Sequence, residues 1–412
     1  MNVILEKPEN PFYTSTIIPD KYFCDRKKET SEIIRKITNG SNLVLMAPRR
    51  LGKSSLIHHV FAQPKILDKY YTLYVDIFGT RTAEDFIAEF QTVFMSAPLA
   101  KNTKLLKSLN AYIKGLNIEL GSVKPDGSVG LPKVNFSATR PPLFSLREMF
   151  DALESADKPV LLVFDEFQQI EYYPERMAAI LRGYIQEKNN TKFIFSGSSR
   201  HMLSTMFQNY SQPFFNSADT INLDIIDAAT YKDFVCENFH SYGKSIEPDA
   251  IEFTYYLMSG STYDMQRIMQ NTFSYAEQGA VVTQEDIRKS IMRILEEKDY
   301  EYREILNKIK SIKDRNTLYC IAFEGIADNM TSSAVMKRYK LDNASSVQNS
   351  LENLGEAKYD HITKLSKGIY QLRDRMFELW LANKAGILDG KFAEPKSRFE
   401  RERQLQSDFT LR

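Results

Sequence analysis

The feature that most constrains the fold is an apolar run at residues 43–46 (LVLM), which leads directly into the sequence APRRLGKSS. A short apolar run bounded by turn residues is typical of a buried strand, and the apolar periodicity over residues 54–62 predicts a helix after it. The junction matches G-x-x-x-x-G-K-[ST] except at its first position, where Ala replaces Gly. It therefore predicts a phosphate-binding loop. The candidate nucleotide-binding residues of this loop are Ala47, Pro48, Arg49, Arg50, Leu51, Gly52, Lys53, Ser54 and Ser55.

Each residue type in the loop has a physical reason. Gly52 lets backbone N–H groups approach phosphate oxygens, and the helix that begins at Ser54 directs its positive end at the anion. Lys53 offsets phosphate charge, and the Ser54 hydroxyl is a hard oxygen ligand for Mg²⁺. If the position of Ala47 requires a positive φ, its Cβ costs about 1 kcal/mol and weakens binding. The alternative is an ordinary strand–turn–helix junction without a ligand.

A second apolar run, residues 160–164 (VLLVF), ends in two acids. After a phosphate-binding loop, this order is typical of nucleotide hydrolases: Asp165 would hold Mg²⁺, usually through a water, and Glu166 would polarise the attacking water. A strand that merely ends at the surface in two acids is the alternative. The candidate catalytic residues are therefore Lys53, Asp165 and Glu166, and the candidate metal ligands are Ser54 and Asp165.

The sequence FSGSSR follows the next apolar run at the carboxyl end of a predicted strand, where ligands bind in open α/β sheets. Ser198 and Arg200 are therefore candidate sensors of the γ-phosphate. A capped turn into a helix over 201–208 explains each residue about as well.

Strand-like runs alternate with helical patterns up to about residue 226, and this alternation predicts an α/β fold with a parallel sheet and right-handed crossovers. Residues 114–140 contain Pro125-Asp126-Gly127 between alternating residues, which predicts a β-hairpin excursion. Later residues read as helical. The predicted domains are a P-loop domain at 1–226, a helical lid at 227–298, a winged helix-turn-helix at 299–384 and a charged tail at 385–412. For the tail we expect a loosely held helix or partial disorder.

The winged-helix prediction rests on the order helix, helix, turn, helix, hairpin over residues 316–372. Seven basic against four acidic residues over 331–373 make this region modestly positive. Duplex DNA is one partner that such a surface fits, and a protein or autoinhibitory contact is the other. The candidate DNA contacts are Lys337, Arg338, Ser345, Ser346, Gln348, Asn349 and Lys367.

Composition narrows the partners. The 412 residues carry 54 Lys and Arg against 53 Asp and Glu, a formal net charge of +1, which excludes a wholly basic nucleic-acid binder. No apolar run approaches the ~18–20 residues that cross a bilayer, so no membrane partner is expected. The isolated cysteines Cys24, Cys236 and Cys320 predict neither disulfides nor a zinc cluster and favour a reducing cytoplasm. Nothing here predicts the oligomeric state.

The motifs together resemble the archaeal-type ATPase family, in the STAND group of P-loop ATPases within the wider AAA+ class. The resemblance spans residues 10–384, and its most specific parts are PRRLGKSS and FDEF. It implies a sheet order of 5-1-4-3-2, then a helical lid and a winged helix. It also implies that Asp25 and Arg26 lie near the adenine pocket.

The resemblance further implies a Gly-Arg pair after the fourth strand, whose Arg approaches the phosphates. Residues 213–217 (PFFNS) hold no Arg. That absence favours a protein that binds ATP without hydrolysing it, whereas the intact Asp165-Glu166 pair favours turnover. From the motifs together we expect an ATP-binding, Mg²⁺-dependent ATPase that uses nucleotide state to reposition a DNA- or protein-binding winged helix. A non-hydrolysing, nucleotide-bound scaffold is the alternative. A small-molecule kinase is a third reading, which lacks a visible acceptor site.

Overall fold

The computed structural model describes residues 8–97, 117–119, 133–135, 142–355 and 358–410. The chain divides into two compact units. We call Ser15–Asp224 the sheet unit, and Met1–Thr14 together with Ile225–Arg412 the helical unit. The predicted separation of lid and winged helix into two domains stays a prediction.

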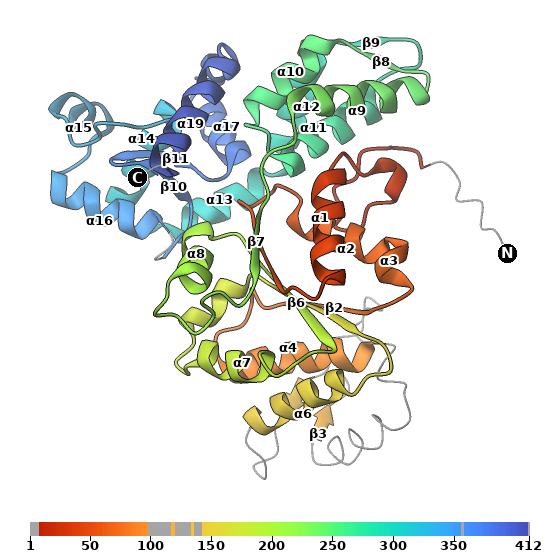
Figure 1. Ribbon diagram of the computed structural model, residues 1–412. Coiled ribbons are helices and arrows are strands. Elements are labelled where there is room, and N and C mark those ends of the chain that lie inside the picture. Colours follow the sequence, from red (N-terminus) through yellow and green to blue (C-terminus); the bar gives the residue numbers. More distant parts are fainter. Residues whose placement is uncertain (1–7, 98–116, 120–132, 136–141, 356–357, 411–412) are drawn as a thin grey trace. The chain divides into compact units, whose positions relative to one another are not determined.

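Five parallel strands form the sheet of the first unit, in the order β2-β5-β6-β1-β7 (Figure 1). Counted along the chain this order is 2-3-4-1-5, the predicted 5-1-4-3-2 read from the other edge. The α/β fold class is therefore confirmed. Every residue of β1 and β5 is buried, as expected where helices cover both faces of a parallel sheet. The strands are β1 (Leu43–Met46), β2 (Tyr71–Asp76), β5 (Val160–Asp165), β6 (Thr191–Gly197) and β7 (Asp219–Asn222).

Helices lie on both faces of this sheet (Figure 1). Phe86, Phe90 and Phe94 recur every four residues along α4 and are fully buried, and Phe90 contacts Phe150 of α6 and Phe164 of β5. Burying one such ring contributes about 1.5–3 kcal/mol, so this aromatic layer secures α4 and α6 on the sheet. The helices of the unit are η1 (Asp20–Tyr22), α1 (Lys27–Thr38), α2 (Lys53–Ala62), α3 (Pro64–Leu67), α4 (Ala83–Ser96), α6 (Pro142–Glu154), η3 (Phe167–Tyr172), α7 (Met177–Ile185) and α8 (Arg200–Gln208).

Two short strands, β3 (Asn117–Glu119) and β4 (Lys133–Asn135), pair antiparallel inside the segment for which a hairpin is predicted. The turn of that hairpin, Pro125-Asp126-Gly127, lies outside the described residues.

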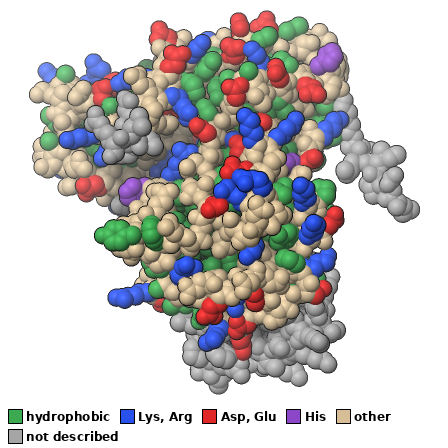
Figure 2. Space-filling model, in the orientation of Figure 1, with side chains coloured by type: hydrophobic (Ala, Val, Ile, Leu, Met, Phe, Trp, Pro, Cys, Tyr) green, Lys and Arg blue, Asp and Glu red, His purple; other side chains and the backbone are tan. Residues whose placement is uncertain are grey.

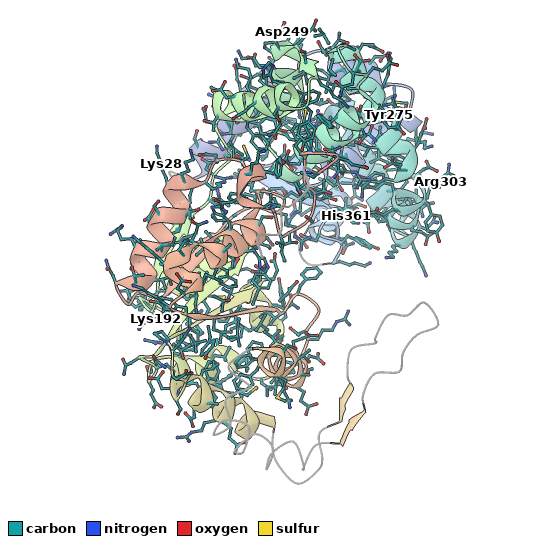
Figure 3. The ribbon with its side chains drawn as sticks, turned by 90° about the vertical axis from the view of Figure 1, so that its right-hand side faces the viewer. Lys28, Lys192, Asp249, Tyr275, Arg303 and His361 are labelled. Carbon is teal, nitrogen blue, oxygen red and sulfur yellow. The ribbon has the colours of Figure 1, made fainter. Side chains whose placement is uncertain are left out.

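The first part of the helical unit is a bundle that also includes the N-terminal segment. Phe12 is buried among three rings, with centroid separations of 6.1 Å to Phe234, 5.5 Å to Phe239 and 5.8 Å to Phe273. Gln270 holds the same segment by donating to the Phe12 carbonyl at 2.9 Å. The elements are α9 (Ala228–Ser241), β8 (Ser245–Ile246), α10 (Pro248–Leu257), α11 (Thr262–Tyr275), β9 (Val281–Val282), α12 (Gln284–Glu297) and α13 (Asp299–Lys308). Figure 3 marks α10 at Asp249 and α11 at Tyr275.

The second part has the predicted winged-helix order of three helices, a hairpin and a closing helix. Its first helix begins at Ile312, four residues before the predicted start, because the Ser311 side chain accepts the Asp314 N–H and caps it. The elements are α14 (Ile312–Glu324), α15 (Ser333–Tyr339), α16 (Ala344–Leu354), β10 (Ile362–Ser366), β11 (Ile369–Leu372) and α17 (Arg375–Lys384).

The residues after 384 are helical, which was one of the two expected forms of the tail, but they are packed rather than loosely held. They form α18 (Leu388–Phe392) and α19 (Pro395–Thr410). In α19 the ring of Phe399 packs against Tyr255 and Tyr256, and the buried carboxylate of Glu402 accepts from Ser259 and Gln371. The tail therefore packs against the helical unit with few apolar residues, because its charged side chains have partners within that unit.

The surface is mixed in charge. On the face shown in Figure 2, Lys and Arg side chains are interspersed with Asp and Glu, in keeping with the net charge of +1. Among the described residues, no helix combines the length and the apolar character needed to cross a membrane.

Candidate nucleotide-binding site

The loop between β1 and α2 has the backbone conformation of a phosphate cradle. Arg50 and Gly52 have positive φ angles of 70° and 81°, the left-handed conformation that occurs in the anion-binding turns of phosphate loops. Ala47 is fully buried and is not among the residues with positive φ, so the strain considered for its Cβ does not arise. The loop thus keeps its shape although its first position is not glycine.

Lys53 begins α2 and lies between the acid that ends β5 and the acid that follows it. Its ammonium is 3.1 Å from Asp165 Oδ1 and 3.0 Å from Glu166 Oε1. The side chains of Lys53 and Asp165 are less than a tenth exposed. The structure therefore brings together the three residues predicted to be catalytic, although Lys53 is more than a hundred positions from the adjacent Asp165 and Glu166 in sequence.

The carboxylate of Asp165 receives hydrogen bonds on both oxygens. Oδ1 accepts the Glu166 N–H at 3.0 Å besides facing Lys53. Oδ2 accepts the Ser54 hydroxyl at 3.0 Å and the Tyr74 hydroxyl. Burial alone would raise the pKa of Asp165, but the Lys53 ammonium and the Tyr74 hydrogen bond outweigh it and hold that pKa below its usual value. Asp165 is therefore ionised at neutral pH.

The donor set of this corner fits Mg²⁺. The Ser54 hydroxyl and the Asp165 carboxylate are adjacent hard oxygens. Within the described residues, no group of three or more His, Cys, Asp or Glu side chains forms a metal cage. Two adjacent protein oxygens suit a cation that takes one or two ligands from the protein and fills its remaining positions with water and phosphate.

Glu166 is held in one orientation by several donors. Its φ is 56°, and Oε2 accepts the Gln168 amide at 2.6 Å and the Ser198 hydroxyl at 2.7 Å. Burial opposes ionisation of Glu166, but Lys53 together with these hydrogen bonds keeps its pKa below the usual value. Gly197 allows the arrangement, since a Cβ there would lie 2.1 Å from the Gln168 side-chain oxygen. Glu166 is thus an oriented, ionised carboxylate.

The two candidate sensors lie in different surroundings. Ser198 contacts Glu166 through its hydroxyl and its N–H. Arg200 instead donates to the Leu223 carbonyl at 2.6 Å, just after β7. The guanidinium of Arg49 lies nearer to Glu166, because its Nε is 3.5 Å from the Ser198 hydroxyl that contacts Glu166. The same guanidinium lies over the Phe78 ring, 5.3 Å from its centroid.

Asp25 and Arg26 precede α1, and both have positive φ angles. The buried Arg26 side chain donates to Glu29 at 2.8 Å and reaches the Leu51 carbonyl at 3.5 Å. It therefore braces the phosphate-binding loop from outside.

The sequence analysis missed two members of this site, Tyr74 and Gln168. Tyr74 stands two residues before the end of β2, beside β5, so its hydroxyl reaches Asp165 only through the register of the two strands. The only available signal for Tyr74 was a hydroxyl side chain near the carboxyl end of β2, a strand that also carries Thr72 and Asp76. Gln168, two residues after Glu166, had no comparable signal.

Among the candidate DNA contacts, Ser345, Gln348 and Asn349 are exposed on α16, whereas Ser346 is half-buried. Lys337 and Lys367 are exposed on α15 and at the hairpin turn, and Figure 3 marks the start of that hairpin at His361. Arg338 forms an ion pair with Glu324 at 3.2 Å, which reduces its availability for phosphate.

The fold and this loop define a P-loop ATPase with a winged helix. Residues 23–268 match the family described as "ATPase domain predominantly from Archaea", and residues 300–383 match the "probable winged helix domain" family. The first match covers more than half of the chain, so the chain belongs to that archaeal-type ATPase family.

Individual relatives are distant. An uncharacterized ATP-binding protein of Methanocaldococcus jannaschii is 27% identical over 162 residues, which cover 36% of this chain and 43% of that protein. The alignment thus spans less than half of the relative's length.

Two solved structures share the fold. A Walker-type ATPase of Pyrococcus abyssi has a TM-score of 0.61 and 18% identity, covering 90% of this chain and 99% of its own. The ORC2 protein of Aeropyrum pernix, solved in ADPNP–ADP complexes, has a TM-score of 0.53 and 16% identity, covering 93% and 98%.

Proposed function

We propose that this protein is a Mg²⁺-dependent ATPase whose nucleotide state repositions its winged helix. The single observation that carries the proposal is the position of Lys53, at the start of α2 and between Asp165 and Glu166. A cation held by two carboxylates at a helix N-terminus is well placed to exchange them for phosphate oxygens.

Each residue then has one role. The loop N–H groups and Lys53 bind the phosphates, and Ser54 and Asp165 hold Mg²⁺, which offsets phosphate charge when bound. Glu166 takes a proton from the attacking water as that water approaches the γ-phosphate. Ser198 and Gln168 keep the Glu166 carboxylate oriented through their hydrogen bonds to Oε2.

A phosphate-release assay on the purified chain, with ATP and Mg²⁺, tests the proposal. We expect turnover in the wild type and none in Lys53→Ala or in excess EDTA. Lys36→Ala is the matched control, because it removes a lysine ion pair of the same unit (to Asp219, 2.9 Å) at the first residue of β7, whereas the loop follows the last residue of β1 at the other end of the sheet. ATP binding without turnover would favour the non-hydrolysing scaffold instead, and no binding at millimolar ATP would reject both.

For the winged helix we propose duplex DNA as the partner. Exposed amide and hydroxyl side chains on α16 can pair with base edges, and the exposed lysines of α15 and the hairpin can contact phosphates. Mobility-shift titrations at several salt concentrations test this. Replacing Lys337 and Lys367 with Ala should weaken binding and reduce the salt dependence. If no mobility shift occurs at low salt, DNA binding is rejected and a protein partner for this surface is favoured.

A further inference from the structure

The hydroxyl of Tyr74 has no role in the proposed function, yet it is bonded to the carboxylate proposed to hold the metal. Tyr74 lies on β2, the neighbour of β5 in the sheet, and donates to Asp165 Oδ2. Its ring packs on His58 of α2 with centroids 4.8 Å apart.

The hydrogen bonds of Asp165 fall into two classes. A carboxylate offers about four acceptor positions, and the groups that contact Asp165 include Lys53, the Glu166 N–H, Ser54 and Tyr74. Under the proposed function Lys53 turns to phosphate and the Ser54 hydroxyl to the cation. The Glu166 N–H on Oδ1 and the Tyr74 hydroxyl on Oδ2 have no such second task.

We propose that Tyr74 is a positioning residue, which fixes the Asp165 carboxylate for Mg²⁺ while Lys53 and Ser54 exchange partners. One constant hydrogen bond on each oxygen prevents the carboxylate from rotating about its Cβ–Cγ bond. Partners that orient a metal ligand in this way are worth about 10–100-fold in metal affinity. This inference rests on the proposed Mg²⁺–ATP function and assigns it a residue outside the loop and the two acids.

Tyr74→Phe tests the inference, because it removes the hydroxyl and keeps the ring against His58. Tyr71→Phe is the matched control: Tyr71 lies on the same strand, and its hydroxyl donates to a carboxylate, Asp157, at 3.2 Å. Binding of a fluorescent ATP analogue is measured in EDTA and across a Mg²⁺ series. In Tyr74→Phe we expect the half-saturating Mg²⁺ concentration to rise about tenfold or more, with affinity in EDTA unchanged. Tyr71→Phe should match the wild type.

Three outcomes overturn the inference. An unchanged Mg²⁺ requirement in Tyr74→Phe shows that the hydroxyl does not position Asp165. Equal losses with and without Mg²⁺ show that Tyr74 supports the whole pocket rather than the metal. If ATP binding by the wild type does not depend on Mg²⁺, the proposed function is overturned as well. The wild-type titration therefore distinguishes failure of the proposed function from failure of the inference about Tyr74.

Discussion

The ammonium of Lys53 lies 3.0 Å from the carboxylate of Glu166. The residue proposed to bind phosphate is thus paired with the residue proposed to activate water. ATP must separate this pair before either can act, so the same contact that orders the site also opposes nucleotide binding.

Glu166→Gln removes one of the two charges that compete with ATP for Lys53. We therefore expect this variant to bind ATP at least as tightly as the wild type, while kcat falls by about 100-fold or more through loss of the general base. ATP titration and phosphate release measure the two effects separately. Glu171→Gln, on the same 3₁₀ turn, is the control. Equal hydrolysis rates in Glu166→Gln and wild type would remove Glu166 from the mechanism.

Ala47→Gly restores the usual first residue of the loop pattern. Because Ala47 is buried without positive φ, we expect no gain in ATP affinity. The unfolding free energy should fall by about 1–2 kcal/mol, from the lost methyl group and the added freedom of the unfolded chain. Urea unfolding and ATP titration check both points, and a clear rise in ATP affinity would show that the Cβ does obstruct the cradle.

The family pattern has a Gly-Arg pair whose arginine approaches the phosphates, and this chain lacks it. Arg49 and Arg200 are the two candidates to replace that arginine. Arg49 reaches Ser198 beside Glu166, whereas Arg200 donates to a carbonyl after β7. We expect Arg49→Ala to lower kcat about tenfold or more, the value of one charge-assisted hydrogen bond, and Arg200→Ala to leave it nearly unchanged. Steady-state kinetics decide between them, and the reverse order would assign the role to Arg200.

Glu378 is fully buried and faces three cations of the winged helix and tail: Arg375, Lys391 at 3.2 Å and Arg398 at 2.9 Å. Glu378→Ala should lower stability by about 3–5 kcal/mol, because it leaves these charges buried without their anion. Arg401→Ala, which breaks an exposed pair with Asp328, should cost less than about 1 kcal/mol. Thermal or urea unfolding compares them, and similar losses in both would contradict the assigned role of Glu378.

Thiol labelling examines the buried cysteines. Burial raises the pKa values of Cys24 and Cys320 to about 12, so almost none of either thiol is ionised at pH 8. Cys236 is only half-buried, and burial raises its pKa less. We expect Cys236 to react first with a disulfide reagent, and the other two only when urea is added. Fast modification of Cys24 in the folded chain would contradict its burial.

The strands, the loop and the two acids could be predicted because they depend on local patterns. Leu43–Met46 and Val160–Asp165 are apolar runs, and the loop chemistry follows from residue types. Strand order came from the family resemblance. The hydrogen bond from Tyr74 depends on strand register, and the direction of Arg200 depends on where β7 ends. Local sequence patterns alone do not predict such contacts between residues that are distant in sequence.

The tail shows the same limit. Low apolar content made a loose helix the natural expectation, but Arg398 pairs with Glu378 and Phe399 with Tyr255, contacts between residues 20 and more than 140 positions apart. The cytoplasmic location and the STAND grouping stay predictions.

The burial of Phe12 among Phe234, Phe239 and Phe273 has a practical consequence for dissecting the molecule. The helical unit is discontinuous in sequence, since its aromatic pocket is filled by a residue that precedes the sheet unit. A fragment that begins at residue 225 would expose this pocket to water and invite aggregation. To be expressed alone, the helical unit needs residues 8–14 supplied again, either as a fused segment or as an added peptide.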